Sequence, residues 1–221
     1  MENYKRALLY VNGVEIPGFF VRGNQSDFLV AVDGGLHHLV IRKRLPDLLI
    51  GDLDSVDPRE YAACEAANVE IIKYPPAKDK SDLELALDLV IERGFKDIVI
   101  VYPFGSRMDY SVANITQLYR PDLADIKITL DDGKTEMHLL RDSDSLSLET
   151  GPNSLISLIA IGDAAKGIST RNLLYPLKKE TLYPWQTRGV SNVPTKKKIT
   201  VYLTEGRLLV VHTRPYSNTK G

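Results

Sequence analysis

The chain has 221 residues, enough for one large domain or two small ones, and its composition is ordinary for a globular protein, with 43% hydrophobic and 26% charged residues. The formal net charge is −1, which disfavours nucleic acid as a partner, and no apolar run reaches the roughly 18 residues that a membrane span needs. A single cysteine, Cys64, excludes an intrachain disulfide. We therefore expect a soluble protein of the reducing cytoplasm.

The first part of the chain alternates strand-like and helix-like segments. Strands, with the loops that follow them, are predicted within 28–32, 46–55, 69–76, 97–105 and 125–133. Helices are predicted over 36–45, 58–69, 81–94 and 108–120. The helix at 81–94 has the clearest signals, because Ser81 and Glu84 form a capping box and Gly94 follows the last turn. This alternation predicts an α/β fold with a mostly parallel sheet and helices on both faces.

After Gly133 the pattern changes to short strands separated by Gly, Pro and Asn. Strands are predicted within 135–140, 145–150, 154–162 and 197–213. The segment from Leu203 to Val210, with Thr-Glu-Gly at its centre, predicts a hairpin. We therefore expect an α/β domain over 1–134 and a smaller all-β domain over 135–221, with a frayed tail at 215–221.

Charged side chains gather where the predicted strands of the first domain end. Asp33 follows the first of these strands, and Asp52 and Asp54 follow the second. The later strand ends add Lys78, Asp79, Ser81, Asp82, Arg107 and Asp109. Since ligands of open parallel sheets bind beyond the carboxyl ends of the strands, we expect these groups to form one site. Taken alone, an aspartate such as Asp82 is also explained as a helix-start residue.

Clustered carboxylates without His or Cys suit a hard cation, above all Mg²⁺. Magnesium usually keeps positions for substrate phosphates, which points to a nucleoside triphosphate. The chain has neither a GxxxxGK[ST] loop nor a GxGxxG motif. We therefore expect the metal, a lysine or arginine, and loop amides near Gly34, Gly35 and Gly105 to hold the phosphates.

Other interpretations of the segment 52–57 are weaker. An EF-hand loop needs glycine at its sixth and glutamate at its twelfth position, where this chain has Asp57 and Ala63. A haloacid-dehalogenase-like phosphatase would need a second acidic motif, and the candidate at 162–167 ends in Gly167. A non-catalytic nucleotide- or metabolite-binding module would not need so many acids near anionic phosphates. The phosphatase and the binding module stay as alternatives.

Several motifs together resemble the thiamine pyrophosphokinase family, the bacterial branch in particular. They are AVDGG (31–35), PDLLIGDLDS (46–55), KDKSDLELAL (78–87), GSRMDYSVANI (105–115), GISTRNLLYPL (167–177) and RGVSN (188–192). The resemblance implies an N-terminal α/β domain that binds ATP and magnesium and a C-terminal β-sandwich that binds thiamine. It also implies a homodimer that transfers a diphosphate group from ATP to thiamine, giving thiamine diphosphate and AMP.

The resemblance also implies roles for individual residues. The magnesium-binding acids match Asp52, Asp54 and Asp82. Other active-site motif positions match Asp33, Lys78, Asp79, Ser81, Arg107, Asp109 and Asn114. In the second domain Ser191 and Asn192 match a thiamine-side motif that is completed across the dimer interface. The family often has histidine where this chain has Tyr110, so a histidine-dependent proton step is not assumed.

The expected chemistry is positioning and charge neutralisation around an in-line attack on the β-phosphorus. Lys78 or Arg107 would meet phosphate oxygens, and either Asp79 or Asp109 would orient the hydroxyl or accept its proton. The cationic thiazolium ring of thiamine favours aromatic faces. Candidates for this contact are Tyr175, Tyr183 and Trp185, for which packing within the β domain is the alternative.

Overall fold

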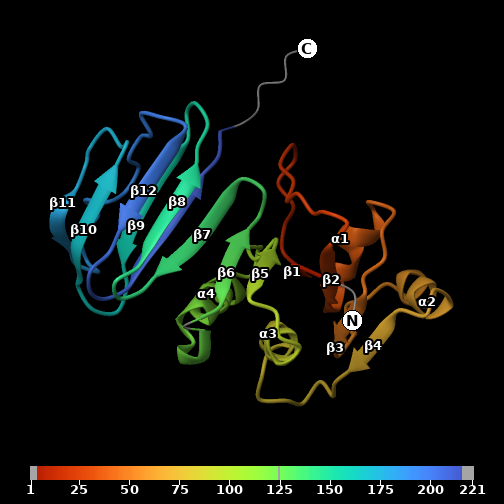
Figure 1. The fold of residues 1–221 in the computed structure, drawn as a ribbon. Helices are drawn as coiled ribbons and strands as arrows, with labels where there is room; N and C mark the ends of the chain where they lie inside the picture. Colours follow the sequence, from red (N-terminus) through yellow and green to blue (C-terminus); the bar gives the residue numbers. More distant parts are fainter. Residues whose placement is uncertain (1–3, 124, 216–221) are drawn as a thin grey trace, which may run out of the picture. The chain divides into compact units, whose positions relative to one another are not determined.

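The computed structural model describes residues 4–123 and 125–215 (Figure 1). Contacts divide the chain into two compact units. Unit 1 comprises Met1–Ile16 and Phe20–Gly133, and unit 2 comprises Pro17–Phe19 and Lys134–Gly221. Except for Pro215, the tail predicted to fray lies outside the described residues. Within the described ranges, no helix combines the length and the apolar character needed to cross a membrane.

Unit 1 is built on a parallel sheet with the strand order β4-β3-β2-β1-β5-β6. The strands are β1 (Arg6–Tyr10), β2 (Asp27–Val32), β3 (Leu48–Gly51), β4 (Glu70–Lys73), β5 (Asp97–Val101) and β6 (Lys127–Asp131). Every residue of β2 and β3 is buried, as expected when both faces of a parallel sheet are covered. The predicted α/β class is thereby confirmed.

Helices cover this sheet. They are α1 (Leu36–Val40), α2 (Pro58–Ala66), α3 (Asp82–Glu92) and α4 (Met108–Thr116), with short 3₁₀ turns η1 (Asp33–Gly35), η2 (Gln117–Tyr119) and η3 (Pro121–Leu123). Leu36 and Leu39 of α1 and Cys64 of α2 share one apolar cluster with side chains of β1, β2, β3 and β5. Helix α3 contacts β1, β2 and β3, and its capping is as predicted, with the Glu84 amide donating to Ser81 Oγ at 3.2 Å.

The strand order of the sheet reverses at β1. It lies between β2 and β5, so the chain builds outward from β1 through β2, β3 and β4 and then returns to the other side of β1 with β5 and β6. Such a reversal of strand order is a topological switch point, where loops leave in opposite directions and open a crevice. Strand β1 was not predicted from the sequence.

Unit 2 contains two antiparallel arrays that enclose an apolar core. One array has the order β7-β13-β9, and the other has the order β11-β10-β12-β8. The strands are β7 (Thr135–Leu140), β8 (Ser145–Glu149), β9 (Leu155–Ala160), β10 (Ala165–Arg171), β11 (Lys178–Leu182), β12 (Lys198–Tyr202) and β13 (Leu208–Thr213). Both arrays contribute buried side chains to one cluster, for example Leu158 of β9 and Val201 of β12, so the predicted all-β sandwich is confirmed.

Two local predictions were wrong. The segment from Leu203 to Val210 is not a hairpin, because β12 pairs with β10 and β8 whereas β13 pairs with β7 and β9. The connection crosses between the two arrays, and Lys166 and Glu205 exchange backbone contacts that hold it there. The helix predicted over 36–45 already ends at Val40. Strands β10 and β11 were also not predicted.

Candidate active site

A cavity of about 330 Å³ lies at the switch point of unit 1. Its walls come from the segment after β1 (Val11 to Val14), the end of β2, and the segment after β5 (Pro103 and Gly105 to Arg107). The first residues of α3, together with Ser55, Tyr110 and Asn114, complete the lining. The cavity therefore occupies the place where open α/β sheets bind their ligands.

The wall on the β1 side depends on a glycine. A Cβ atom at Gly13 would lie 1.9 Å from the carbonyl oxygen of Tyr102 and 2.5 Å from that of Phe104, closer than real contacts allow. The amide of Val14 donates to the carbonyl oxygen of Phe104 at 2.7 Å. The segments after β1 and β5 thus touch backbone to backbone, which fixes the spacing of two cavity walls.

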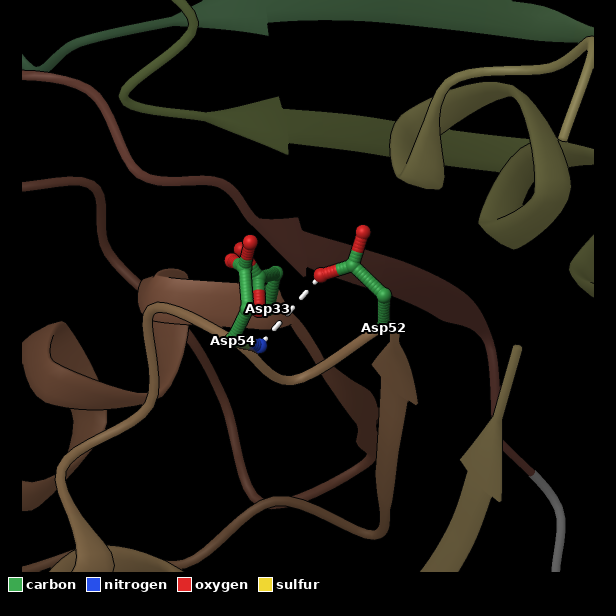
Figure 2. Close-up of side chains that lie close together, drawn as sticks. All are labelled: Asp33, Asp52 and Asp54. Atoms are coloured by element: carbon green, nitrogen blue, oxygen red, sulfur yellow. Dashed lines mark hydrogen bonds between the residues drawn. The ribbon is translucent and has the colours of Figure 1, made fainter. Parts of the chain in front are cut away.

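Three carboxylates gather beyond the end of β3. Oxygens of Asp33, Asp52 and Asp54 lie within 4.8 Å of one another, and we call this group the acidic trio (Figure 2). Asp33 and Leu53 have φ angles of 50° and 66°, a left-handed conformation that non-glycine residues rarely adopt. Because Leu53 separates Asp52 from Asp54, this backbone turn sets the directions of both carboxylates. Strain of this kind is concentrated at functional sites.

Charge within the trio is only partly balanced. The negative charges of Asp52 and then Asp33 raise the pKa of Asp54. The Lys78 ammonium lowers the pKa of Asp52, to which it donates at 3.0 Å, and it also lies 3.1 Å from Asp82 Oδ1. The Asp52 amide donates to the same Asp82 oxygen at 3.1 Å. Asp82, predicted as a metal ligand, is therefore adjacent to the trio and contacts Lys78 and the backbone of Asp52.

The donor set fits a hard divalent cation. It consists of carboxylate oxygens alone, which Mg²⁺ and similar ions prefer. Asp33 Oδ1 is buried and has no hydrogen-bond partner among the described residues, while Asp33 Oδ2 accepts from Ser55 Oγ. Ser55 Oγ in turn accepts from the Gly34 amide at 3.1 Å, so one oxygen of Asp33 is anchored and the other is available to a cation.

Arg107 and Asp109 lie at the start of α4 and bind each other. Arg107 donates to Asp109 with both Nε, at 2.9 Å, and Nη2, at 2.5 Å, and its guanidinium lies 4.6 Å from the centre of the Tyr110 ring. The hydrogen bond from Arg107 lowers the pKa of Asp109 to about 2. Asp79 is exposed on the loop before α3. The geometry does not favour either Asp79 or Asp109 as the general base.

Two other predicted site residues, Asn114 and Asn192, use their side chains to hydrogen-bond to the backbone of other segments. Asn114 Nδ2 donates to the carbonyl oxygen of Pro103 at 2.7 Å and so holds a wall of the cavity. In unit 2, Asn192 is buried, and its amide group accepts from the Tyr175 and Val193 amides and donates to the Tyr175 carbonyl oxygen. Ser191 is exposed and has a φ angle of 60°. Asn192 therefore fixes the backbone of Tyr175 with its side chain.

Exposed aromatic residues lie on unit 2. Tyr175 is 67% exposed, and the rings of Tyr183 and Trp185 stack with their centres 5.0 Å apart. Large exposed aromatic groups of this kind are typical of binding surfaces. The alternative for these three residues was packing in the β domain or its loops. Tyr175 and Trp185, the latter 77% exposed, do not lie in the core, whereas the stacking of Tyr183 on Trp185 fits packing within a loop.

Sequence reasoning missed the segment from Val11 to Val14 and also Ser55. The signal for the first was Asn12-Gly13, a turn dipeptide directly after the apolar stretch of β1. Ser55 had a weaker signal, as the residue that follows the two aspartates. Its hydrogen bond to Asp33 joins loops that are far apart in the sequence, so no local pattern indicated it.

Comparisons with known proteins identify the family and the fold. Two family models match the chain in order: thiamin pyrophosphokinase, catalytic domain, at residues 22–130, and thiamin pyrophosphokinase, vitamin B1 binding domain, at residues 145–208. A thiamine pyrophosphokinase of Bacillus subtilis is 27% identical over 198 residues, which cover 89% of this chain and 92% of the relative.

Solved structures are similar over nearly the whole chain. The crystal structure of thiamine pyrophosphokinase from Bacillus subtilis superposes with a TM-score of 0.86 at 25% identity, covering 96% of this chain and 100% of the other. A thiamin pyrophosphokinase family protein from Enterococcus faecalis has a TM-score of 0.80 at 22% identity, covering 95% and 99%. The second likeness concerns the fold alone. With both of its domain models matched in order, the chain belongs to the thiamine pyrophosphokinase family.

Proposed function

We propose that ATP binds in the cavity of unit 1 with Mg²⁺ at the acidic trio, and that this site transfers a diphosphate group to thiamine. As a member of its family, the chain is a thiamine diphosphokinase, a transferase of thiamine diphosphate biosynthesis that uses ATP. Enzymes of this family use a divalent metal ion, and we propose that this ion is Mg²⁺. Nothing in the comparisons favours the phosphatase or the non-catalytic binding module.

One observation carries the proposal: the buried, unpartnered Oδ1 of Asp33 belongs to a trio of carboxylates that also includes Asp52 and Asp54. A binding module for anionic phosphates would gain nothing from like charges in such a group. With a divalent cation between them, the same carboxylates hold a triphosphate instead of repelling it. Asp33 thus joins Asp52 and Asp54 as a proposed ligand, and Asp82 positions Asp52 and Lys78.

The reaction requires the thiamine hydroxyl oxygen to attack the β-phosphorus in line. A new oxygen–phosphorus bond forms, the bond between the β-phosphorus and the oxygen that bridges it to the α-phosphorus breaks, and AMP leaves with that oxygen. Bound Mg²⁺ supplies Lewis-acid neutralisation of phosphate charge. The hydroxyl proton passes to a carboxylate, for which Asp79 and Asp109 stay the two candidates.

Lys78 and Arg107 would bind phosphate oxygens in addition to the metal. Lys78 is partly buried, and although burial opposes it, hydrogen bonds to Asp52 and Asp82 raise the pKa of its ammonium group, which therefore stays charged. Arg107 would exchange its bidentate contact with Asp109 for a phosphate, a group of similar geometry. That exchange would also release Asp109 to act on the hydroxyl.

Thiamine recognition is proposed for unit 2. Tyr175, held by Asn192, and the stacked pair Tyr183 and Trp185 offer aromatic faces to the cationic thiazolium ring. Ser191 stays a predicted contact. A homodimer is likewise proposed from the family resemblance, and light scattering of the purified chain measures its mass. The cytoplasmic location stays a prediction from the cysteine content.

The activity is tested by chromatography of a reaction that contains the protein, ATP, Mg²⁺ and thiamine. We expect AMP and thiamine diphosphate in equal amounts, and neither product when thiamine or Mg²⁺ is omitted. ADP with thiamine monophosphate would refute attack at the β-phosphorus. Inorganic phosphate released without thiamine would indicate the phosphatase, and binding of ATP without any product would indicate the non-catalytic module.

A further inference from the structure

A buried histidine lies directly behind the cavity. His38 of α1 is 7% exposed, and its Nε2 lies 3.0 Å from the carbonyl oxygen of Gly13, in the segment after β1. His38 does not line the cavity, but Gly13 and its neighbours Asn12 and Val14 do. The imidazole therefore contacts a residue of the cavity wall without lining the cavity itself.

The chemistry of this contact defines the tautomer. A carbonyl oxygen can only accept, so Nε2 must carry a proton and donate. Within the part of the chain that the structure describes, His38 Nδ1 is buried without a hydrogen-bond partner, and Glu15 Oε2 lies 3.9 Å from it. Burial lowers the pKa of His38, although the Gly13 carbonyl and Glu15 oppose this shift. The side chain is thus a neutral donor with one fixed orientation.

The surroundings lock the ring in place. The Tyr102 ring lies 4.6 Å from the imidazole, centre to centre, and Arg42 donates to both the Tyr102 hydroxyl and the His38 carbonyl oxygen. Arg42 also pairs with Glu15 at 2.7 Å. A network of this kind costs energy to assemble around a histidine, and a Leu at position 38 would satisfy the apolar packing of α1 more simply. Histidine differs from leucine at this position because its Nε2 donates a hydrogen bond to the Gly13 carbonyl oxygen.

We propose that His38 is a positioning residue that holds the segment from Val11 to Val14 in its ATP-binding conformation through the Gly13 carbonyl. The inference rests on the proposed binding of ATP in the cavity. His38 itself touches neither substrate nor metal. The backbone at Gly13 approaches the Tyr102 carbonyl so closely that a Cβ atom there would lie 1.9 Å from its oxygen, and the Val14 amide donates to the Phe104 carbonyl oxygen. The hydrogen bond from His38 adds a further restraint on the same segment.

The test compares His38→Gln, which keeps an N–H donor near Nε2, with His38→Met, which fills similar space without a donor. His37, on the same helix but with 64% of its side chain exposed, supplies the matched controls His37→Gln and His37→Met. Calorimetry measures binding of α,β-methylene-ATP with Mg²⁺, and steady-state kinetics separates the KM for ATP from kcat and from the KM for thiamine.

We expect His38→Met to weaken binding of the analogue and raise the KM for ATP by about tenfold, the effect of one lost hydrogen bond. His38→Gln and both His37 variants should stay within about twofold of the unsubstituted protein, as should kcat and the KM for thiamine in all variants. Unchanged binding in His38→Met overturns the inference, and so does equal loss in His38→Gln, which would indicate packing alone.

Two measurements keep this inference separate from the proposed function. Hydrogen–deuterium exchange without nucleotide should be faster at residues 11–14 in His38→Met than in His38→Gln, and equal exchange overturns the inference even if the unsubstituted protein binds no ATP. If His38→Met does not fold, ¹⁵N nuclear magnetic resonance spectra of the unsubstituted protein test the inference through the tautomer of His38. They should show His38 as the neutral Nε2–H tautomer at neutral pH, and an Nδ1–H tautomer overturns the inference.

Discussion

The acidic trio of unit 1 and a buried polar cluster of unit 2 both gather charged side chains, but their atoms have different partners. The second group, the Glu136 cluster, consists of Glu136, His138, Ser154, His212 and Arg214. His212 Nδ1 lies 2.7 Å from Glu136 Oε1, His212 Nε2 lies 3.1 Å from Ser154 Oγ, and Arg214 donates to Glu136 Oε2 at 2.7 Å. In the trio, by contrast, the nearest neighbours of each carboxylate include other carboxylates.

The pKa shifts express this difference. Burial alone would raise the pKa of Glu136, but hydrogen bonds to His138 and His212 and the charge of Arg214 lower it. The pKa of Asp54 is raised, because its neighbours carry the same charge. A lowered pKa means that the charged acid contributes to folding stability, which holds for Glu136 and also for Asp52 beside Lys78. The raised pKa of Asp54 means that its charge costs stability until a cation binds. The Glu136 cluster of unit 2 therefore stabilises the fold, whereas the acidic trio of unit 1 is the proposed cation site.

The largest expected effect comes from Asp52→Asn and Asp54→Asn, made separately. Each keeps the shape of the side chain and removes a charge from the proposed metal site. We expect kcat to fall by roughly 10²- to 10⁴-fold, or about 3–5 kcal/mol of transition-state stabilisation. Thermal stability should change little or rise in Asp54→Asn, because the charges of Asp52 and Asp33 raise the pKa of Asp54. It should fall modestly in Asp52→Asn, because Asp52 loses the charge that Lys78 binds at 3.0 Å. The measurement is kcat across a Mg²⁺ titration beside a thermal melt.

Asp57→Ala is the matched control for these two variants. Asp57 follows Asp52 and Asp54 in the same loop, and its side chain accepts from the Arg59 amide at 2.7 Å as the N-cap of α2. Its loss should cost about 1 kcal/mol of stability and leave kcat nearly unchanged. If Asp52→Asn and Asp54→Asn behaved like Asp57→Ala at limiting Mg²⁺, the acidic trio would be a set of loop caps.

Glu136→Gln should have the largest effect on stability. Removing the charge leaves Arg214 and the histidines without their buried partner, and we expect a loss of about 3 kcal/mol in the free energy of unfolding near neutral pH. The folded-state pKa of Glu136 lies below its unfolded value of about 4.3, so this contribution is present above that pH and is lost as the pH falls through the folded-state value.

Urea denaturation of Glu136→Gln and of the unsubstituted protein measures the free energy of unfolding. Measurements at about pH 7 and about pH 3.5 test both the size of the loss and its dependence on pH. The difference between the two proteins should shrink at the lower pH. Glu205→Gln is the control, because Glu205 is exposed and pairs with Lys166 at 2.6 Å, and its loss should cost less than about 1 kcal/mol. Equal effects of the two substitutions would remove the contrast between a stabilising cluster and a surface pair.

Asn192→Ala should have smaller effects than the substitutions in the acidic trio and at Glu136, and it should affect both stability and thiamine binding. It removes hydrogen bonds that hold the backbone of Tyr175, at a cost of about 1–2 kcal/mol in stability. If Tyr175 contacts thiamine, the KM for thiamine should rise by roughly fivefold while the KM for ATP stays unchanged. A double-mutant cycle with Tyr175→Ala should then be non-additive. Additive effects, or an equal rise in both KM values, would argue against action through Tyr175.

Local signals in the sequence were sufficient for several features. The apolar run before Asp52 predicted a buried strand with two carboxylates at its end, and Ser81, Glu84 and Gly94 predicted both ends of α3. These features depend on neighbours within a few residues, so the chain encodes them by spacing and residue type alone. The change from alternating helices and strands to strands alone also predicted both fold classes.

Only the tertiary structure decided which separated segments meet. The sequence did not indicate that β1 lies at the centre of the parallel sheet or that the segment after β12 crosses to another array. It predicted that Asp33, Asp52, Asp54 and Asp82 gather at one edge of the sheet, but not that Asp33 is the acid whose oxygens lie within 4.8 Å of those of Asp52 and Asp54. The family resemblance implied that Asn192 is a thiamine-side residue, and only the structure showed that its amide group hydrogen-bonds to the backbone of Tyr175 and Val193. Strand neighbours and hydrogen-bond partners are selected by long-range packing and by the need to satisfy buried polar groups, and neither leaves a periodic trace in the local sequence.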